Sequence, residues 1–165
     1  QSCKVWVGHL LFLYSSSKDV SGARKLLPQA LKSLPKRKHI KLTCKAAQME
    51  YKYGSVERAR TLFEGVLANA PKRVDIWSVY LTMEENRLAT FATSNNQASP
   101  DNGLLESQNF TRRLFERVVH LRMSSKKAKF FFKRFLDFEK IHGTPATVEH
   151  VKELARAYVE ANMAE

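Results

Sequence analysis

Apolar residues recur along the chain with the spacing of an amphipathic helix, and one such pattern occurs three times. The segment 59–67 reads ARTLFEGVL, and its apolar residues fall at i, i+3, i+4, i+7 and i+8, on one face of a helix. The segment 23–31, ARKLLPQAL, matches it position for position 36 residues earlier, and 111–119, TRRLFERVV, is a looser copy. The pattern therefore predicts repeated helices, each with an apolar face to bury.

Start and stop signals frame the first two of these helices. Asp19 and Ser55 stand where an N-cap is expected, and their side-chain oxygens can accept a hydrogen bond from a free backbone N–H. Pro35 and Pro71 follow the apolar stripes, and proline cannot continue the helical hydrogen-bond ladder. We therefore expect both helices to end just before these prolines.

A second helix is predicted before each copy of the pattern. The strings MEYKYG and FEKIHG end on Gly54 and Gly143, which we expect to be left-handed C-caps. After the second glycine, Thr144 and Pro145 have the residue types of an N-cap and a first helical residue. The repeated unit is therefore a helix, a tight turn, a second helix and a linker.

This unit predicts an all-α fold, because one helix pair cannot bury its own apolar faces and stacked pairs can. We expect residues 1–165 to form a single domain, a superhelical solenoid of about four antiparallel helix pairs. The pairs are expected at about 4–34, 37–70, 73–122 and 125–161. The third pair is longer because 86–109 contains ATSNNQASPDNG, which predicts a flexible inserted surface loop.

The charge of the chain bears on its partners. Lys and Arg together number 28 and Asp and Glu 16, so the formal net charge is +12. Such an excess favours polyanionic partners, either RNA or acidic protein surfaces. No membrane partner is expected, because the longest early apolar stretch, 5–14, is too short to span a bilayer. Cys3 and Cys44 are expected to be reduced core thiols in a reducing compartment.

The sequence contains none of the common catalytic or nucleotide-binding motifs. It has no G-x-x-x-x-G-K-[ST], G-x-S-x-G or G-x-G-x-x-G, and its five histidines form no H-E-x-x-H. We therefore expect no enzyme activity, no cofactor, no metal and no small-molecule substrate. Four glutamates on the predicted helices are instead expected to pair with arginines of adjacent helices. These glutamates are Glu50, Glu84, Glu116 and Glu139, and the candidate partners are Arg24, Arg60 and Arg113.

Three clusters of basic residues occur at or near the linker before a unit's first helix, where stacking of the units would align them along one edge. This spacing favours a ridge that contacts RNA phosphates. An ordinary solvated face and a docking surface for an acidic protein segment are the alternatives. The candidate RNA- or partner-binding residues are Lys36, Arg37, Lys38 and Lys41 with nearby Lys45, then Lys72 and Arg73, then Lys126, Lys127, Lys129, Lys133 and Arg134.

Aromatic residues interleave with the third basic cluster, and most of them are predicted to be core. Their stripe consists of Ala128, Phe131, Phe135 and Phe138. A continuous stripe favours burial over a platform for stacked bases. Phe130 and Phe132 flank the stripe and are expected to contact the next repeat. The final helix, from 148 to about 161, also has an apolar side, and any exposed part of it would favour self-association or a partner helix.

An aromatic helix ending in Glu, followed by A-R-x-L-F-E-x-x-L and a proline, resembles the HAT (half-a-TPR) repeat. Three longer strings resemble the C-terminal HAT domain of one family: APKRVDIWSVYLTME (70–84), RRLFERVVHLRMSSKKAKFFFKRFLDFEKIHGT (112–144) and VKELARAYVE (151–160). This is the programmed cell death protein eleven family of very large pre-ribosomal RNA processing factors, in which many OB-fold repeats precede the HAT repeats.

The resemblance implies a nucleolar factor that helps assemble both ribosomal subunits, with the small-subunit processome as one setting. The HAT part would act as a non-catalytic scaffold for pre-ribosomal assembly proteins and for pre-rRNA. The alternatives are a direct RNA-binding module and a HAT scaffold of an mRNA cleavage or splicing complex, where such arrays often dimerise.

Overall fold

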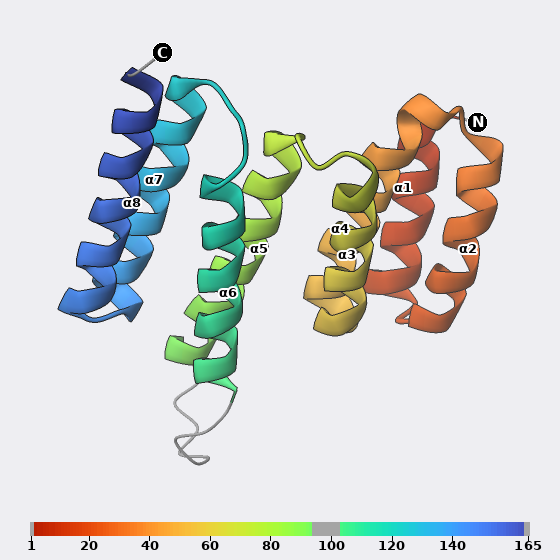
Figure 1. The fold of residues 1–165 in the computed structure, drawn as a ribbon. Coiled ribbons are helices and arrows are strands. Elements are labelled where there is room, and N and C mark those ends of the chain that lie inside the picture. Colours follow the sequence, from red (N-terminus) through yellow and green to blue (C-terminus); the bar gives the residue numbers. More distant parts are fainter. Residues whose placement is uncertain (1, 94–102, 164–165) are drawn as a thin grey trace. The chain divides into compact units, whose positions relative to one another are not determined.

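The computed structural model describes residues 2–93 and 103–163, and every regular element in these residues is helical (Figure 1). The elements are α1 (Cys3–Leu11), a π turn η1 (Phe12–Ser16), α2 (Val20–Ser33), a 3-10 turn η2 (Lys36–Lys38), α3 (His39–Tyr53), α4 (Val56–Asn69), α5 (Val74–Thr93), α6 (Leu104–Val119), α7 (Ser125–His142) and α8 (Pro145–Met163). The predicted all-α fold of paired helices is confirmed.

The chain divides into two compact units. The N-terminal unit, residues 1–83, contains α1 to α4 and the first half of α5. The C-terminal unit, residues 84–165, contains the rest of α5 and α6 to α8. Each unit has its own set of buried side chains and its own interhelical contacts.

The helix ends follow the predicted signals. The Asp19 carboxylate accepts a hydrogen bond from Gly22 N–H at 2.9 Å at the start of α2, and Ser55 Oγ accepts one from Arg58 N–H at 3.3 Å at the start of α4. Pro35 lies just after α2 and Pro71 just after α4. Both predicted N-caps and both predicted stops are therefore confirmed.

Small residues let the helices of the N-terminal unit approach closely. Ala23 and Ala30 on α2 and Ala46 on α3 are fully buried in the core of this unit, where a small side chain takes up little space between packed helices. Further along, the ring of Phe63 on α4 stacks on Tyr80 of α5 with centroids 4.7 Å apart. Aromatic stacking thus joins α4 to α5 in the core of this unit.

Phenylalanines fill the core of the C-terminal unit. Phe115 of α6 stacks on Phe135 of α7 with centroids 5.1 Å apart, and it also contacts Phe138 at 5.4 Å. The predicted stripe on α7 is buried, as expected. Phe132 packs on Tyr158 of α8, within the same helix pair and not on another repeat, with the ring centroids 5.7 Å apart. Phe130 is 51% exposed.

The helices reach further into the predicted inserted loop, 86–109, than the sequence composition indicates. Leu88 is buried, so α5 keeps an inward face and continues to Thr93. At the other side, α6 begins at Leu104, and Arg87 Nη1 donates a hydrogen bond to Ser107 Oγ across the two helices. The central part of the predicted loop, 94–102, lies outside the described residues.

Candidate interaction surfaces

The first basic cluster lies at the entry to α3. Lys36, Arg37 and Lys38 form η2, and Lys41 follows in the first turn of α3. Lys36, Arg37 and Lys41 are exposed, and Lys38 is half-buried. The turn η2 follows Pro35, which fixes an extended backbone immediately before the cluster and so holds it at the helix start.

The second cluster is partly neutralised. Lys72 and Arg73 lie in the connection between α4 and α5 and are exposed. Arg73 donates two hydrogen bonds to Asp75, from Nε at 3.0 Å and from Nη2 at 2.8 Å, and they lower the pKa of the Asp75 carboxyl. Lys72 is therefore the residue of this pair that is better placed to meet a phosphate.

These two clusters lie at the same end of the N-terminal unit, because the connection from α2 to α3 and that from α4 to α5 both turn there (Figure 1). The thiol of Cys44 on α3 supports this placement. Burial raises its pKa to about 11, the charge of Asp75 adds to the shift, and Arg73 and Lys45 oppose it. Asp75 and Arg73 are therefore close enough to α3 to act on it electrostatically.

The third cluster lies in the first half of α7. Lys126, Lys127, Lys129 and Lys133 are exposed. Arg134 is half-buried: its Nη2 lies 3.2 Å from Glu85 Oε1, and its guanidinium lies over the Phe130 ring at 5.7 Å. Arg134 thus ties α7 to α5 within the C-terminal unit, and the four lysines remain the exposed charges of the cluster.

An open groove of about 630 Å³ runs between α7 and α8. Its apolar wall includes Phe132, Leu136, Val151, Ala155 and Val159. Three lysines, Lys129, Lys133 and Lys152, also line it, and we call this feature the lysine-rimmed groove. Lys152 was not among the residues predicted from sequence, although its i+3 and i+7 spacing to Ala155 and Val159 was a usable signal.

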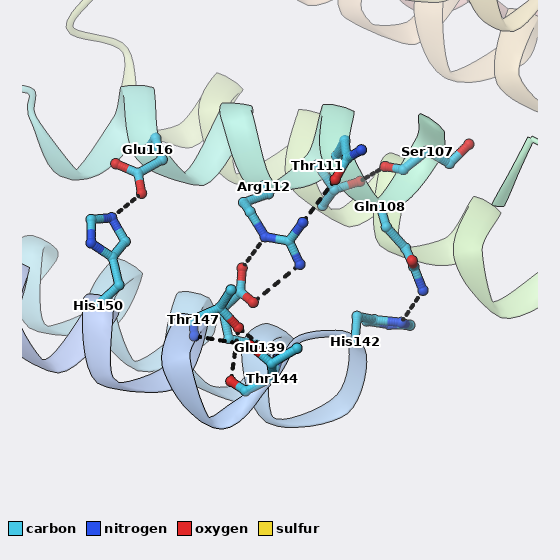
Figure 2. Close-up of polar contacts among 11 residues, drawn as sticks. Ser107, Gln108, Thr111, Arg112, Glu116, Glu139, His142, Thr144, Thr147 and His150 are labelled. Carbon is cyan, nitrogen blue, oxygen red and sulfur yellow. Dashed lines mark hydrogen bonds and ion pairs between the residues drawn. The ribbon is translucent and has the colours of Figure 1, made fainter. Parts of the chain in front are cut away.

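Polar contacts join α6 to α7 and α8 in the same unit (Figure 2). Arg112 binds Glu139 of α7, with Nε at 2.5 Å and Nη2 at 3.2 Å from the two carboxylate oxygens. His150 of α8 donates to Glu116 of α6 at 2.6 Å. Figure 2 also shows the paired hydrogen bonds of Thr144 and Thr147, which cap α8 as its predicted start requires.

The N-terminal unit contains the same arrangement. Arg24 of α2 binds Glu50 of α3, as predicted, at 2.8 and 2.9 Å. Glu139, however, is bound by an arginine that was not among the candidates, the neighbour of the candidate Arg113. The adjacent Arg112 faces α7, whereas Arg113 is exposed and lies over the Phe110 ring. One residue along a helix is a rotation of about 100°, so only one of the two arginines can reach the carboxylate.

Gly54 and Gly143 end their helices for a different reason from the one predicted. Their φ angles, −123° and −103°, are not left-handed, so the prediction of left-handed C-caps is wrong. A Cβ on Gly54 would instead overlap Oε2 of Glu50, and one on Gly143 would overlap Oε2 of Glu139. Because glycine has no Cβ, each of these positions leaves room for the buried carboxylate of the glutamate four residues earlier.

The buried glutamates are structural in their geometry. Glu50 and Glu139 are each held by an arginine of the last helix of the preceding pair, and Glu84 on α5 is fully buried. The expected role of Arg60 stays a prediction. Across residues 2–93 and 103–163, no cluster of three or more His, Cys, Asp or Glu side chains is placed to hold a metal ion. In the same residues, no helix combines the length and apolar character needed to cross a membrane.

Comparison with known proteins adds a family and a set of relatives. The sequence model of the family described as "PRP39 N-terminal HAT repeat" matches residues 2–161. The mouse (Mus musculus) "Protein RRP5 homolog" is 39% identical over 161 residues, which is 98% of this chain and 8% of that protein. The "rRNA biogenesis protein RRP5" of Arabidopsis thaliana is 39% identical over 165 residues, 99% of this chain and 8% of its own length.

A fungal relative gives the same picture. The "rRNA biogenesis protein rrp5" of Schizosaccharomyces pombe is 37% identical over 161 residues, 98% of this chain and again 8% of that protein. The chain thus spans about 8% of the length of the curated relatives it matches.

Proposed function

The chain belongs to the HAT-repeat family, and we propose that it is a non-catalytic scaffold domain of a ribosome biogenesis factor. In this role it binds pre-ribosomal assembly proteins in the nucleolus and takes part in pre-rRNA processing. We also propose that it occupies the C-terminal HAT part of a much longer factor. Repeated helix pairs are a fold that offers partners a binding surface, and the buried Glu50 and Glu139 are held in structural ion pairs.

One observation carries the proposal. Relatives from a plant and a fungus that are named for rRNA biogenesis, and a mouse relative named as an RRP5 homolog, align with nearly the whole chain at 37–39% identity. Because the alignments cover 98–99% of the chain, they span both compact units and not a single helix pair. This supports the ribosomal role over a scaffold of mRNA cleavage or splicing.

Crosslinking in nucleolar extract tests the scaffold role. A tagged copy of the chain is crosslinked, and the attached proteins and RNAs are identified. A helical protein of another family with the same net charge serves as the control, because a charge of +12 attracts ribonucleoprotein without specificity. We expect pre-ribosomal assembly proteins to be enriched over the control. Enrichment of mRNA cleavage or splicing proteins instead would overturn the proposal.

Direct RNA contact is a second candidate function, favoured by the exposed lysines of the basic clusters. Since Arg73 and Arg134 already bind carboxylates, we expect the lysines to make most phosphate contacts. The test is the salt dependence of binding to a pre-rRNA fragment, which should weaken steeply as salt rises.

Lysine substitutions localise that RNA contact. Replacing Lys36, Lys38 and Lys41 together with glutamine should reduce the salt slope by roughly one for each lysine that had bound a phosphate. Lys25→Gln, an exposed lysine on α2 outside the clusters, is the matched control and should leave the slope unchanged. Affinity that stays flat between low and moderate salt would exclude a phosphate-contacting ridge.

A further inference from the structure

We propose that the lysine-rimmed groove between α7 and α8 binds an acidic amphipathic helix of a partner protein. The inference deepens the proposed function and rests on it for the partner's place in a pre-ribosomal particle, because it names the chemistry of one partner that the scaffold holds. The groove itself, its apolar wall and its charges belong to the C-terminal unit alone.

The groove wall offers apolar surface that the unit does not use for its own core. Val159 is 49% exposed, and Leu136 and Ala155 are only half-buried. Phe132 and Val151 also line the groove but are buried, so they belong to the packed core of the unit. Aliphatic side chains at an open groove gain free energy when another apolar surface covers them, about 25 cal/mol for each Å² removed from water.

The length of the groove suits a short helix. The residues that line it run from Ser125 to Leu136 on α7 and from Val151 to Asn162 on α8. Each run advances about 16 Å along its helix, at about 1.5 Å per residue. A partner helix of about three turns would lie along both ridges, as a helix commonly does between two others.

The charge of the groove selects an acidic partner. Lys129, Lys133 and Lys152 line it, and none of its lining residues is acidic. The glutamates of α8 at 149, 153 and 160 fall on a different face of that helix from Ala155 and Val159. A helix with an apolar stripe flanked by Glu or Asp would therefore place its carboxylates near three ammonium groups.

Two other occupants fit less well. RNA bases bind protein by stacking on exposed aromatic faces, but Phe132 is buried against Tyr158 and the rest of the wall is mainly aliphatic. A second copy of the chain would bring another net charge of +12 to a basic groove. Like charges at that density oppose self-association.

Fluorescence anisotropy with the whole chain tests the proposal. The probe is a labelled, end-blocked peptide of about 15 residues with leucines at i, i+3, i+4 and i+7 and glutamates at the flanking positions. We expect saturable binding that weakens with salt. Replacing Lys129, Lys133 and Lys152 together with glutamate reverses the charge of the groove and should weaken peptide binding at least about tenfold. Val159→Glu should weaken it as much.

Matched variants separate the groove from general basicity. Lys140→Glu and Ile141→Glu change an exposed lysine and a 76% exposed isoleucine on α7 that do not line the groove. Both should bind the peptide as the unchanged chain does, and circular dichroism checks that every variant stays helical. A control peptide with the same composition in scrambled order should not bind.

Each contrary result overturns the inference in a recognisable way. Absence of peptide binding, or equal binding of the scrambled peptide, removes the acidic helix as occupant. An oligouridine RNA whose binding is lost in Val159→Glu would assign the groove to RNA, and a dimer dissolved by Val159→Glu in sedimentation would assign it to a second copy. None of these results depends on which proteins crosslink in nucleolar extract, so failure here is distinct from failure of the scaffold role.

Discussion

The guanidinium of Arg24 on α2 donates two hydrogen bonds to the carboxylate of Glu50 on α3, from Nε at 2.8 Å and from Nη2 at 2.9 Å. Tyr14 of η1 donates a third at 2.6 Å, and the backbone N–H of Ser55, which caps α4, donates a fourth at 2.9 Å. One fully buried carboxylate therefore joins η1, α2, α3 and the start of α4 in the N-terminal unit.

Glu50→Gln should destabilise the N-terminal unit strongly. An amide keeps the shape of the side chain but removes the charge that balances Arg24, and its NH2 group is a donor where the second carboxylate oxygen accepts hydrogen bonds. We expect a loss of about 2–3 kcal/mol in the free energy of unfolding, less than for a fully buried pair because the side chain of Arg24 is 39% exposed. Urea unfolding measures it. Glu57→Gln, an exposed glutamate on α4, should cost under about 1 kcal/mol.

The same carboxylate should make stability depend on acid. Burial alone would raise the pKa of Glu50, but the hydrogen bonds from Arg24, Tyr14 and Ser55 outweigh it, and the pKa is lowered. A lowered pKa in the folded state contributes stability above the unfolded value, about 4.3, and the contribution is lost as pH falls through the folded value.

The comparison with Glu50→Gln isolates this effect. The difference in unfolding free energy between the unchanged chain and the variant should be largest near neutral pH and should shrink as the pH falls below about 5. Urea unfolding at a series of pH values measures the difference. A difference that stays constant down to pH 3 would mean that the carboxylate titrates alike in both states.

Gly54→Ala should destabilise the chain although alanine ordinarily favours folding. The new Cβ would overlap Oε2 of Glu50 and force the buried carboxylate away from Arg24. We expect a cost of about 1–3 kcal/mol, and a similar one for Gly143→Ala beside Glu139.

Gly65→Ala is the matched control for these glycine variants. Gly65 lies inside α4, and a Cβ there would meet no atom within 4 Å. Alanine should therefore stabilise this helix by about 0.5–1 kcal/mol. If all three alanines shifted the urea midpoint in the same direction, the close approach of glycine and glutamate would not be the cause.

Cys44 should react slowly with thiol reagents. Burial raises its pKa to about 11, so at pH 8 the folded chain contains about a hundredfold less thiolate at this position than an ordinary cysteine provides. In a Cys3→Ser background, labelling by a disulfide reagent should be slow in buffer and fast in urea. A rate that levels off near pH 9 in the folded chain would contradict the raised pKa.

The local features of the fold were within reach of the sequence. Asp19 and Ser55 cap helices through residues three positions away, and the stripe of phenylalanines on α7 depends on the period of one helix. The features that were missed depend on two helices at once. Whether Arg112 or Arg113 binds Glu139 depends on how α6 is rotated about its axis relative to α7. The sequence of either helix alone does not determine that rotation.

The candidate surface divides in the same way. Lys129 and Lys133 were predicted from the basic run on α7, but the groove they line exists only because α8 packs beside them and adds Lys152. The signal for the groove was divided between two segments of the chain. The sequence located the lysines. The packing of α7 on α8 adds the apolar wall beside them, so that charge and apolar surface form one groove.

The overlap that a Cβ would meet at Gly54 and Gly143 has a consequence for homologous sequences. In each case the glutamate stands four positions ahead of the glycine. Where the helix ends at the second position, as α3 and α7 do, a larger residue there is tolerable only if the first has become shorter or apolar. Across a family alignment the two columns should therefore covary, and anyone grafting this repeat into a designed array must carry them over as a pair.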